Sequence, residues 1–259
     1  MNTLTIMSYN IRNSNDDTGE NAWSNRKAAL VALIKSRRPD ILCMQEALPD
    51  QMQYLRAMLP DYDFFGVGRD DGGMSGEFSP VFFRRSLFEN VGAKTVWLSE
   101  TPLLPSCGWD AHHNRICTLV ALKEKETGQV IGVASLHLEH AGPIAQVKGA
   151  EVAREAALSS LQTQCFLAGD YNCAVGSKPY QVMTQEPLRD ARLDAPERSD
   201  LATFHGFGKK ELTLEASPID HIFYTPGLYH PVRAEVLAIK MNGRYPSDHF
   251  PLLVTFQNG

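Results

Sequence analysis

The sequence predicts an α+β fold in which two β-sheets pack face to face and helices cover their outer surfaces. Short apolar runs recur along the whole chain, most of them bounded by Gly, Pro, Asn or Asp, and this pattern is typical of strands. Longer amphipathic segments stand between some of these runs. No linker, repeat or low-complexity tract interrupts the 259 residues, so we expect one domain spanning 1–259.

The predicted strands are rich in Val, Ile, Leu, Phe or Thr, and about ten such runs are more than one small sheet needs. They are Leu4–Asn10, Ile41–Gln45, Pro80–Arg84, Thr95–Ser99, Ile116–Leu122, Val130–Leu138, Cys165–Asp170, Ile219–Tyr224, Val232–Ile239 and Leu252–Phe256. Glu186–Ser199 contains two prolines and alternating charges, which predicts a surface connection. The glycine-rich segment Gly66–Gly76 predicts a loop.

The predicted helices carry apolar residues three or four positions apart, which places those residues on one face. They are Asn21–Ser36, Asp50–Leu59 and Pro143–Gln162. Pro39 follows the first helix and Pro60 the second, and proline after an apolar stripe is a stop signal. Arg26 lies on the apolar stripe of the first helix.

Composition excludes several classes of protein. Hydrophobic residues make up 43% and charged residues 21%, which excludes a disordered chain or a coiled coil. The formal net charge of −5 argues against a nucleic-acid binder of the usual basic kind. The N-terminal stretch lacks a signal-peptide pattern, and no apolar run is long enough to span a membrane. Three of the five cysteines (Cys43, Cys117 and Cys165) lie in apolar runs, so we expect reduced, buried thiols and a cytoplasmic location without a membrane partner.

Polar side chains stand at the ends of several predicted strands. Each of them alone is more often a turn residue or a cap than part of a site. Their repetition along one chain favours convergence at one sheet edge, where side chains from neighbouring strands meet. The residues are Asn10, Gln45 and Glu46, His137, Asp170 and Asn172, Asp220 and His221, and Ser247 to His249.

Carboxylates, amides and imidazoles together suit one kind of chemistry. Mg²⁺ and Mn²⁺ take hard oxygen ligands, commonly carboxylates together with substrate phosphate. Hydrolysis of a phosphate ester also needs an activated water and a proton donor or a positive charge near the leaving oxygen. The sequence therefore predicts a divalent-metal-dependent phosphoesterase with Mg²⁺ or Mn²⁺ as its cofactor.

The ordered motifs support this interpretation. Asn10, Gln45-Glu46, His137, the GDYN and IDHI motifs and the closing SDHFP motif together resemble the endonuclease/exonuclease/phosphatase superfamily, whose best-known fold is that of deoxyribonuclease I. Further stretches such as GVGRDDG, GEFSPVFFRR and GRYPSDHFP are similar to a bacterial subgroup without an assigned substrate. The resemblance spans essentially the whole chain and implies a four-layer α/β/β/α sandwich.

The resemblance also implies metal ligands. Glu46 matches the main metal ligand of the superfamily, and it is also the carboxylate that its position after a strand favours. Asn10 matches the amide beside the metal and the phosphate. Asp248 matches a carboxylate that either contacts the metal or orients the neighbouring histidine.

The remaining roles belong to acid–base chemistry. By resemblance, Asp170 and Asn172 position or deprotonate the attacking water and hold the phosphate, and His249 is the second histidine of the site. His137 matches the histidine of the deoxyribonuclease-like branch, and we expect Asp220 to fix its tautomer. Whether Asp170 or His249 is the general base stays open.

Three further residues are candidates for substrate binding. Glu77 opens a strand next to the glycine-rich loop, although a solvated loop acid is an equally good interpretation. Arg115 precedes a strand and is suited to a bidentate contact with a phosphate, although a surface salt bridge is nearly as good an account. His205, in the TFHGF stretch, lies one loop before Asp220 and is within possible reach of the substrate.

The substrate is predicted by elimination. Basic pairs are limited to Arg37-Arg38, Arg84-Arg85 and Lys209-Lys210, too few for the usual duplex-binding surface. We therefore expect a small organic phosphomonoester or phosphodiester. The alternatives are a nuclease of the same mechanism acting on DNA or RNA, and a non-catalytic module that binds phosphate esters. The sequence leaves the oligomeric state open.

Overall fold

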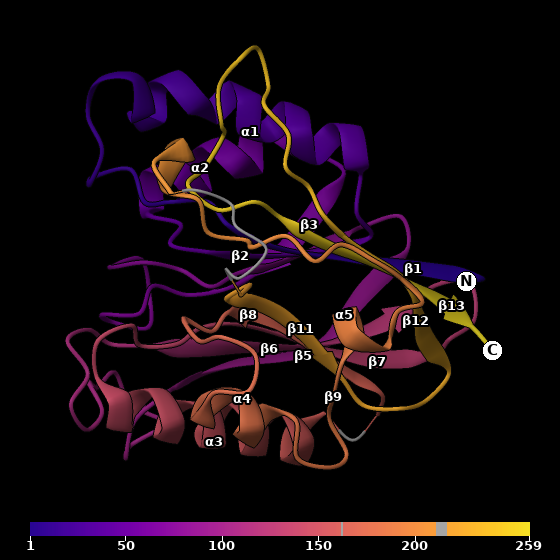
Figure 1. Ribbon diagram of the computed structural model, residues 1–259. Coiled ribbons are helices and arrows are strands. Elements are labelled where there is room, and N and C mark those ends of the chain that lie inside the picture. Colours follow the sequence, from indigo (N-terminus) through magenta and orange to yellow (C-terminus); the bar gives the residue numbers. More distant parts are fainter. Residues whose placement is uncertain (162, 211–216) are drawn as a thin grey trace.

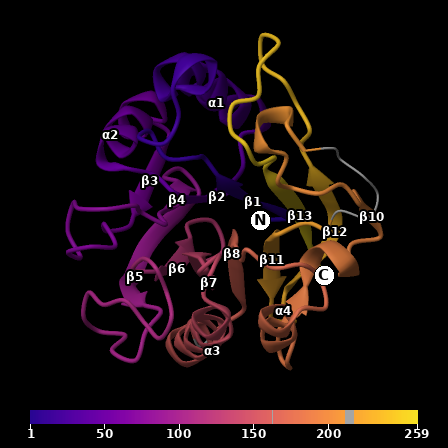
Figure 2. The same ribbon diagram turned by 60° about the vertical axis from the view of Figure 1, so that its left-hand side comes forward.

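The computed structural model describes residues 1–161, 163–210 and 217–259. It arranges them in four layers, with two β-sheets packed against each other and helices on both outer faces. Figure 1 shows α1 and α2 on one side of the sandwich and α3 and α4 on the other, and Figure 2 shows the same separation after rotation. The predicted α/β/β/α sandwich is confirmed.

The first sheet is mixed and has seven strands in the order β10-β12-β13-β1-β2-β4-β3. Its strands are β1 (Thr3–Asn10), β2 (Ile41–Gln45), β3 (Tyr62–Phe65), β4 (Val81–Arg84), β10 (Glu197–Arg198), β12 (Tyr229–Val236) and β13 (Leu252–Asn258). Helices α1 (Trp23–Arg37) and α2 (Pro49–Met58) pack on its outer face. A short 3-10 helix, Gly19–Asn21, precedes α1.

The second sheet has six strands in the order β5-β6-β7-β8-β11-β9. Its strands are β5 (Phe88–Trp97), β6 (Ile116–Glu124), β7 (Val130–His137), β8 (Cys165–Asp170), β9 (Arg189–Asp190) and β11 (Asp220–Tyr224). Helices α3 (Pro143–Ser160) and α4 (Lys178–Met183) cover it, and the short α5 (Ala191–Asp194) packs against β11 and β12. A second 3-10 helix spans Gly206–Gly208.

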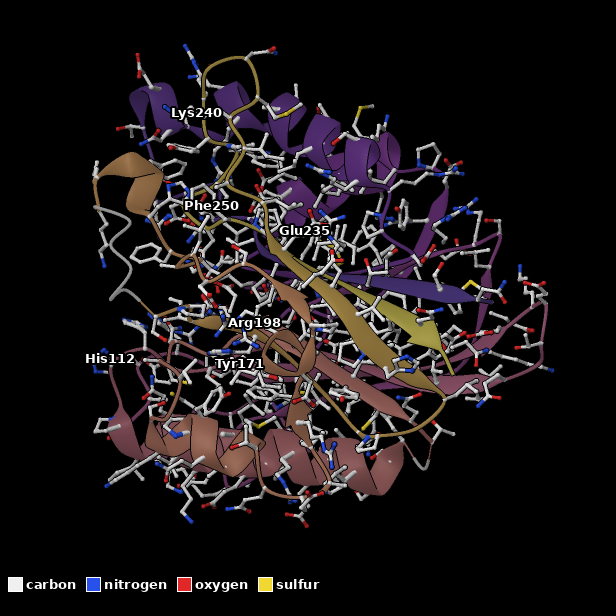
Figure 3. The ribbon with its side chains drawn as sticks, turned by 45° about the vertical axis from the view of Figure 1, so that its right-hand side comes forward. His112, Tyr171, Arg198, Glu235, Lys240 and Phe250 are labelled. Atoms are coloured by element: carbon white, nitrogen blue, oxygen red, sulfur yellow. The ribbon has the colours of Figure 1, made fainter. Side chains whose placement is uncertain are left out.

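The central strands are buried on both faces, which explains why they read as nearly continuous apolar runs. In β1, Leu4 and Ile6 belong to the core between the sheets, whereas Met7 and Tyr9 pack under α1 and α2. A third core joins the second sheet to α3. Side-chain alternation along one strand therefore supplies two cores at once. Figure 3 shows Tyr171 and Phe250 inside the molecule and His112 at its outer edge.

The structure corrects several predicted elements. β5 begins at Phe88 rather than Thr95, because it is an edge strand whose first half is exposed and therefore lacks an apolar signal. β12 covers Tyr229–Val236 rather than Val232–Ile239, with a register shift next to Pro231. The predicted surface connection 186–199 contains β9, α5 and β10 and buries several side chains, including Asp190 and Arg192. α3 ends at Ser160, and the predicted last residue, Gln162, lies outside the described residues.

The cysteines agree with the sequence expectation. Cys43, Cys117 and Cys165 are buried free thiols, as is Cys173, while Cys107 is exposed. None of the helices in the described ranges combines the length and the apolarity that crossing a bilayer requires.

Candidate active site

Strand register brings the predicted polar residues to one edge of the sandwich. Asn10 pairs with Gln45 at the ends of the parallel strands β1 and β2. His137 pairs in the same way with Asp170 at the ends of β7 and β8, and Asp220 faces Asp170 at the start of β11. This edge lies away from the two chain termini in Figure 1. It contains a cavity of about 770 Å³.

The backbone turns sharply where the strands end. Three residues have backbone φ angles in the left-handed region that residues other than glycine seldom adopt. They are Arg12 (56°), Glu46 (62°) and Asn172 (48°). All three line the cavity. Such conformations cost of order 1–3 kcal/mol each and concentrate at functional sites. The strain directs these side chains toward a common space.

Asp170 stands at the centre of the cluster and is about 1% exposed. Its Oδ2 accepts a hydrogen bond from Nδ2 of Asn10 at 2.9 Å, and its Oδ1 accepts one from the backbone N–H of Asn172 at 2.9 Å. Nε2 of His137 lies 3.5 Å from Oδ2, and Nε2 of His249 lies 3.7 Å from it. Two imidazoles therefore flank one buried carboxylate.

His249 is oriented by Asp220. Its Nδ1 lies 2.8 Å from Oδ2 of Asp220, and both side chains are buried. Burial disfavours the charged imidazole, but Asp220 and Asp170 outweigh burial and raise the pKa of His249 to about 10. The expectation that Asp220 fixes the tautomer of His137 is wrong, because the carboxylate of Asp220 accepts a hydrogen bond from His249 instead. Asp248 does not take this orienting role, since its hydrogen bond within the described residues comes from Ser247.

His137 lies in a different environment. Its Nε2 is 3.0 Å from Nδ2 of Asn172, which fits an unprotonated Nε2, while its Nδ1 is buried with no partner among the described residues. Burial, followed by the positive charges of Arg115 and Arg69, lowers the pKa of His137 well below its ordinary value. The two imidazoles beside Asp170 are therefore driven toward opposite protonation states.

Glu46 closes the other side of the cluster. Its Oε1 accepts from Nδ2 of Asn10 at 2.9 Å, and its Oε2 accepts from the backbone N–H of Asn13 at 3.0 Å. Asn10 thus bridges Glu46 and Asp170 through its amino group, while its amide oxygen accepts the N–H of Arg12. An amide oxygen has two lone pairs, and Arg12 uses one of those of Asn10. The expectation that Asn10 is a metal ligand therefore stays a prediction.

The donor set fits a hard divalent cation. Ligand atoms of Glu46, His137 and Asp170 lie within 4.8 Å of one another. Asp248 lines the same cavity, and its Oδ2 lies 3.8 Å from Nε of Arg12. Burial, together with the charge of Asp220, raises the pKa of Asp170 to about 7. Carboxylate oxygens are ligands that hard divalent cations prefer.

Arg26 holds both sides of this edge together and was not predicted as a site residue. Its side chain is about 1% exposed. Nε donates to the carbonyl of Asn21, Nη1 to those of Ile11 and Pro246, and Nη2 to those of Arg12 and Asn13. The guanidinium thereby joins the loop that contacts Glu46 to the segment that leads into Asp248 and His249. Its place on the apolar face of the first helix was the available signal.

A pair of arginines lines another side of the cavity. We define the arginine wall as Arg69, Glu77 and Arg115, all of which line the cavity. Glu77 and Arg69 form a close ion pair through Oε2 and Nη1, and Nε of Arg115 lies 3.2 Å from Oε2 of the buried Glu139. Burial raises the pKa of Glu77 to about 7 against the effect of Arg69. The structure thus places Glu77 and Arg115 at the cavity, and Arg115 is buried rather than part of a surface salt bridge.

His205 is not a cavity residue. It is about 1% exposed, and its ring stacks on Phe250 with 3.9 Å between centroids. Its Nδ1 accepts the backbone N–H of Gly208 and stabilises the turn around Gly206–Gly208. The expectation that His205 contacts substrate is therefore corrected, because the side chain packs inward behind the SDHFP segment.

Comparison with known proteins agrees with this geometry. Residues 7–249 match the sequence model of the Endonuclease/Exonuclease/phosphatase family. An endonuclease/exonuclease/phosphatase family protein from Bacteroides thetaiotaomicron is 34% identical, with a TM-score of 0.93 over 99% of this chain and 98% of its own. A mannosyl-6-phosphatase from the same organism is also 34% identical, with a TM-score of 0.90 over 98% of this chain and 99% of its own.

Among curated proteins, Nocturnin of Drosophila melanogaster is 24% identical over 91% of this chain. The chain spans 42% of that protein's length.

Proposed function

Given that the chain belongs to the endonuclease/exonuclease/phosphatase family, whose members hydrolyse phosphate esters, we propose that it is a divalent-metal-dependent phosphoesterase acting on a small organic molecule. The proposed reaction is attack of water on a phosphomonoester or phosphodiester. The observation that carries the proposal is the convergence of Glu46, His137, Asp170 and the Asp220–His249 pair on one cavity.

The proposed roles follow from the hydrogen bonds. Asp220 holds His249 so that its Nε2 faces Asp170 and the cavity, where it can donate to an oxygen of the bound phosphate. Nδ1 of His249 donates to Asp220, and its Nε2 lies 3.7 Å from Asp170, beyond hydrogen-bond distance. The raised pKa of His249 favours the protonated imidazole, so we assign Asp170 as the group that accepts the proton of the attacking water. Asn172 fixes Asp170 through its backbone N–H and reaches His137 through its side chain.

The cation belongs on the Glu46 side. Glu46 and Asp170 would hold it, with Asp248 and His137 nearby, and it would supply Lewis-acid polarisation of the phosphoryl group. Asn10 would then keep the two carboxylates at a fixed separation through its amino group.

Four observations support a small substrate over a nucleic acid. The net charge is −5, and the arginines of the cavity wall are paired with carboxylates rather than free to bind successive phosphates. The cavity volume of about 770 Å³ is within the range for small-molecule sites. A relative of 34% identity carries the name mannosyl-6-phosphatase.

The first experiment measures hydrolysis of p-nitrophenyl phosphate and bis-p-nitrophenyl phosphate in EDTA, Mg²⁺ or Mn²⁺. We expect metal-dependent turnover that falls about 10²–10⁴-fold in His249→Ala, the usual effect of losing an acid–base group. Glu46→Gln should keep the fold and weaken metal binding. The matched control is Glu151→Gln on the exposed face of α3, which should behave as wild type.

The outcomes separate the alternatives. Turnover with both esters that His249→Ala does not reduce would remove His249 from the mechanism. A large loss of melting temperature for Glu46→Gln in metal-free buffer would assign Glu46 a structural role. Hydrolysis of a single-stranded oligonucleotide but of neither small ester would favour a nuclease. Binding of Mg²⁺ by calorimetry without hydrolysis of any ester would indicate a binding module.

A further inference from the structure

We propose that the arginine wall is a subsite for a neutral, hydroxyl-rich group, so that the substrate is a phosphate ester of a sugar or similar polyol. This inference rests on the proposed phosphoesterase function, because the wall shares one cavity with the carboxylate and imidazole cluster. It concerns the part of the substrate that is not the phosphate. The unused hydrogen-bonding atoms of Arg69, Glu77 and Arg115 point to such a group.

The side chain of Arg115 is buried rather than at the protein surface. Its side chain is 6% exposed, Nε lies 3.2 Å from Glu139, and Nη2 lies 3.1 Å from Nδ1 of His140. Its backbone carbonyl accepts the N–H of Leu98. Among the described residues, Nη1 has no protein acceptor, although the side chain lines the cavity. A buried arginine with an uncommitted donor is suited to meeting a ligand.

Arg69 and Glu77 supply the complementary atoms. Their close ion pair uses Nη1 of Arg69 and one oxygen of Glu77, and Nη2 of Arg69 has no acceptor in the described part of the chain. The backbone of Arg69 is fixed by Nε1 of Trp97 at 2.6 Å and by the side chain of Asn114. The wall thus offers guanidinium donors beside a carboxylate acceptor on a supported loop.

This combination matches hydroxyl groups. A hydroxyl donates one hydrogen bond and accepts up to two, so neighbouring hydroxyls can contact an arginine and a glutamate at the same time. A site built to hydrogen-bond hydroxyls also rejects analogues that lack them, because its buried polar atoms are then left unpaired.

Charge distinguishes a neutral polyol from a second anion. Arg69 is paired with Glu77 and also lies 3.9 Å from Asp70, while Arg115 is paired with Glu139. Each positive charge therefore has its own carboxylate. A second phosphate would bring negative charge to carboxylates with no uncompensated arginine to receive it. The wall consequently favours a group without charge.

The test compares substrates matched in size but not in hydroxyl content. Hydrolysis of glucose 6-phosphate, mannose 6-phosphate and n-hexyl phosphate is measured for wild type, Glu77→Gln and Arg115→Lys. We expect at least one sugar phosphate to exceed n-hexyl phosphate about tenfold or more in kcat/KM, and each variant to lose about tenfold of that preference. Glu89→Gln, on the exposed part of β5, is the control and should keep the preference.

Each other outcome has a definite meaning. Equal losses on sugar and hexyl phosphates would overturn the subsite, as would preference for fructose 1,6-bisphosphate or a mononucleotide over every sugar monophosphate. If wild type hydrolyses no ester with any metal, the proposed function fails, and calorimetric binding of glucose 6-phosphate and n-hexyl phosphate in EDTA then decides the subsite. Preference for the sugar that Glu77→Gln abolishes supports it, and absence of preference overturns it.

Discussion

Arg26 and Arg115 are both almost fully buried, yet their surroundings differ in kind. Arg26 directs its guanidinium N–H groups to backbone carbonyls and has no carboxylate within ion-pair distance among the described residues. Arg115 has Glu139 as a counter-ion and lines the cavity with Nη1 uncommitted. Burial alone therefore does not assign a role to an arginine. The identity of its acceptors, and the donors left over, distinguish a structural support from a binding group.

The difference also concerns which groups each arginine holds. Arg26 connects the carbonyls of Ile11 and Pro246, which precede the two segments that carry Asn13 and His249. Arg115 follows the long loop after β5 and contacts Glu139, two residues beyond His137. Arg26 therefore sets the spacing of the two segments, whereas Arg115 would meet the non-phosphate part of the substrate in the proposed subsite.

The largest effect should come from Arg26→Met. The change removes a buried cation and leaves several buried carbonyls without donors, so we expect a loss of about 3–5 kcal/mol in the free energy of unfolding. Denaturant unfolding monitored by circular dichroism measures it. Arg26→Lys should recover less than half of the loss, because an ammonium has three donors and cannot match the planar guanidinium. Full stability in Arg26→Lys would show that charge, rather than the set of hydrogen bonds, is what matters.

A smaller effect is expected for Arg115→Met, about 2 kcal/mol, because Glu139 keeps the backbone N–H of Ala141 as a partner. The double variant Arg115→Met/Glu139→Gln should be more stable than Arg115→Met, since no buried carboxylate is left unpaired. Thermal unfolding of the three proteins tests this. If the double variant is less stable than the single one, Glu139 has a role independent of Arg115 and the contrast with Arg26 weakens.

The smallest expected effect is on the pH dependence of stability, which should differ between the surroundings of Arg115 and those of Arg26. Burial opposes ionisation of Glu139, but the Ala141 N–H and Arg115 outweigh it and lower its pKa from 4.5 to about 2. A depressed pKa stabilises the fold fully above about pH 4.5 and progressively less as the pH falls toward 2. Wild type should therefore lose free energy of unfolding between pH 4.5 and pH 2. We expect this loss to be about 1 kcal/mol smaller in Glu139→Gln, which has no carboxyl group at this position to protonate.

Arg26→Lys should leave the acid-dependent difference between wild type and Glu139→Gln unchanged, because the acceptors of Arg26 are carbonyls, which do not titrate in this range. Chemical denaturation at several pH values between 2 and 6 measures both. An identical pH slope in wild type and Glu139→Gln would contradict the assignment.

The sequence predicted most of the fold because the central strands of both sheets are buried on both faces. Such strands appear as uninterrupted apolar runs, as in Ile41–Gln45 and Cys165–Asp170, and their ends are marked by polar residues. Edge elements were harder to predict. The exposed first half of β5 carries no apolar pattern, and the short elements within 186–199 are stabilised by distant contacts rather than local propensity.

The site residues were found for a related reason, since polar groups directly after apolar strands stand out in the sequence. Glu46, His137, Asp170, Asp220 and His249 all reach the same edge, as strand register requires. The pairing among them was not predictable. Asp220 lies on the neighbouring strand of Asp170, but only the fold shows that it bonds His249 rather than His137. His205 was chosen because it lies one loop before Asp220, and its side chain packs into the interior.

The sequence by itself determined the layers, the strand ends and the residue types available for chemistry. Hydrophobic periodicity and the residues that end helices and strands are local properties of the chain. Only the tertiary structure decided which donor meets which acceptor. Arg26 and Arg115 contact groups that are distant in sequence, and Asp220 could have paired with either of two histidines. Which of these contacts form depends on strand register and on burial. Hydrogen bonds are directional over about 3 Å, so residue identity without position cannot specify them.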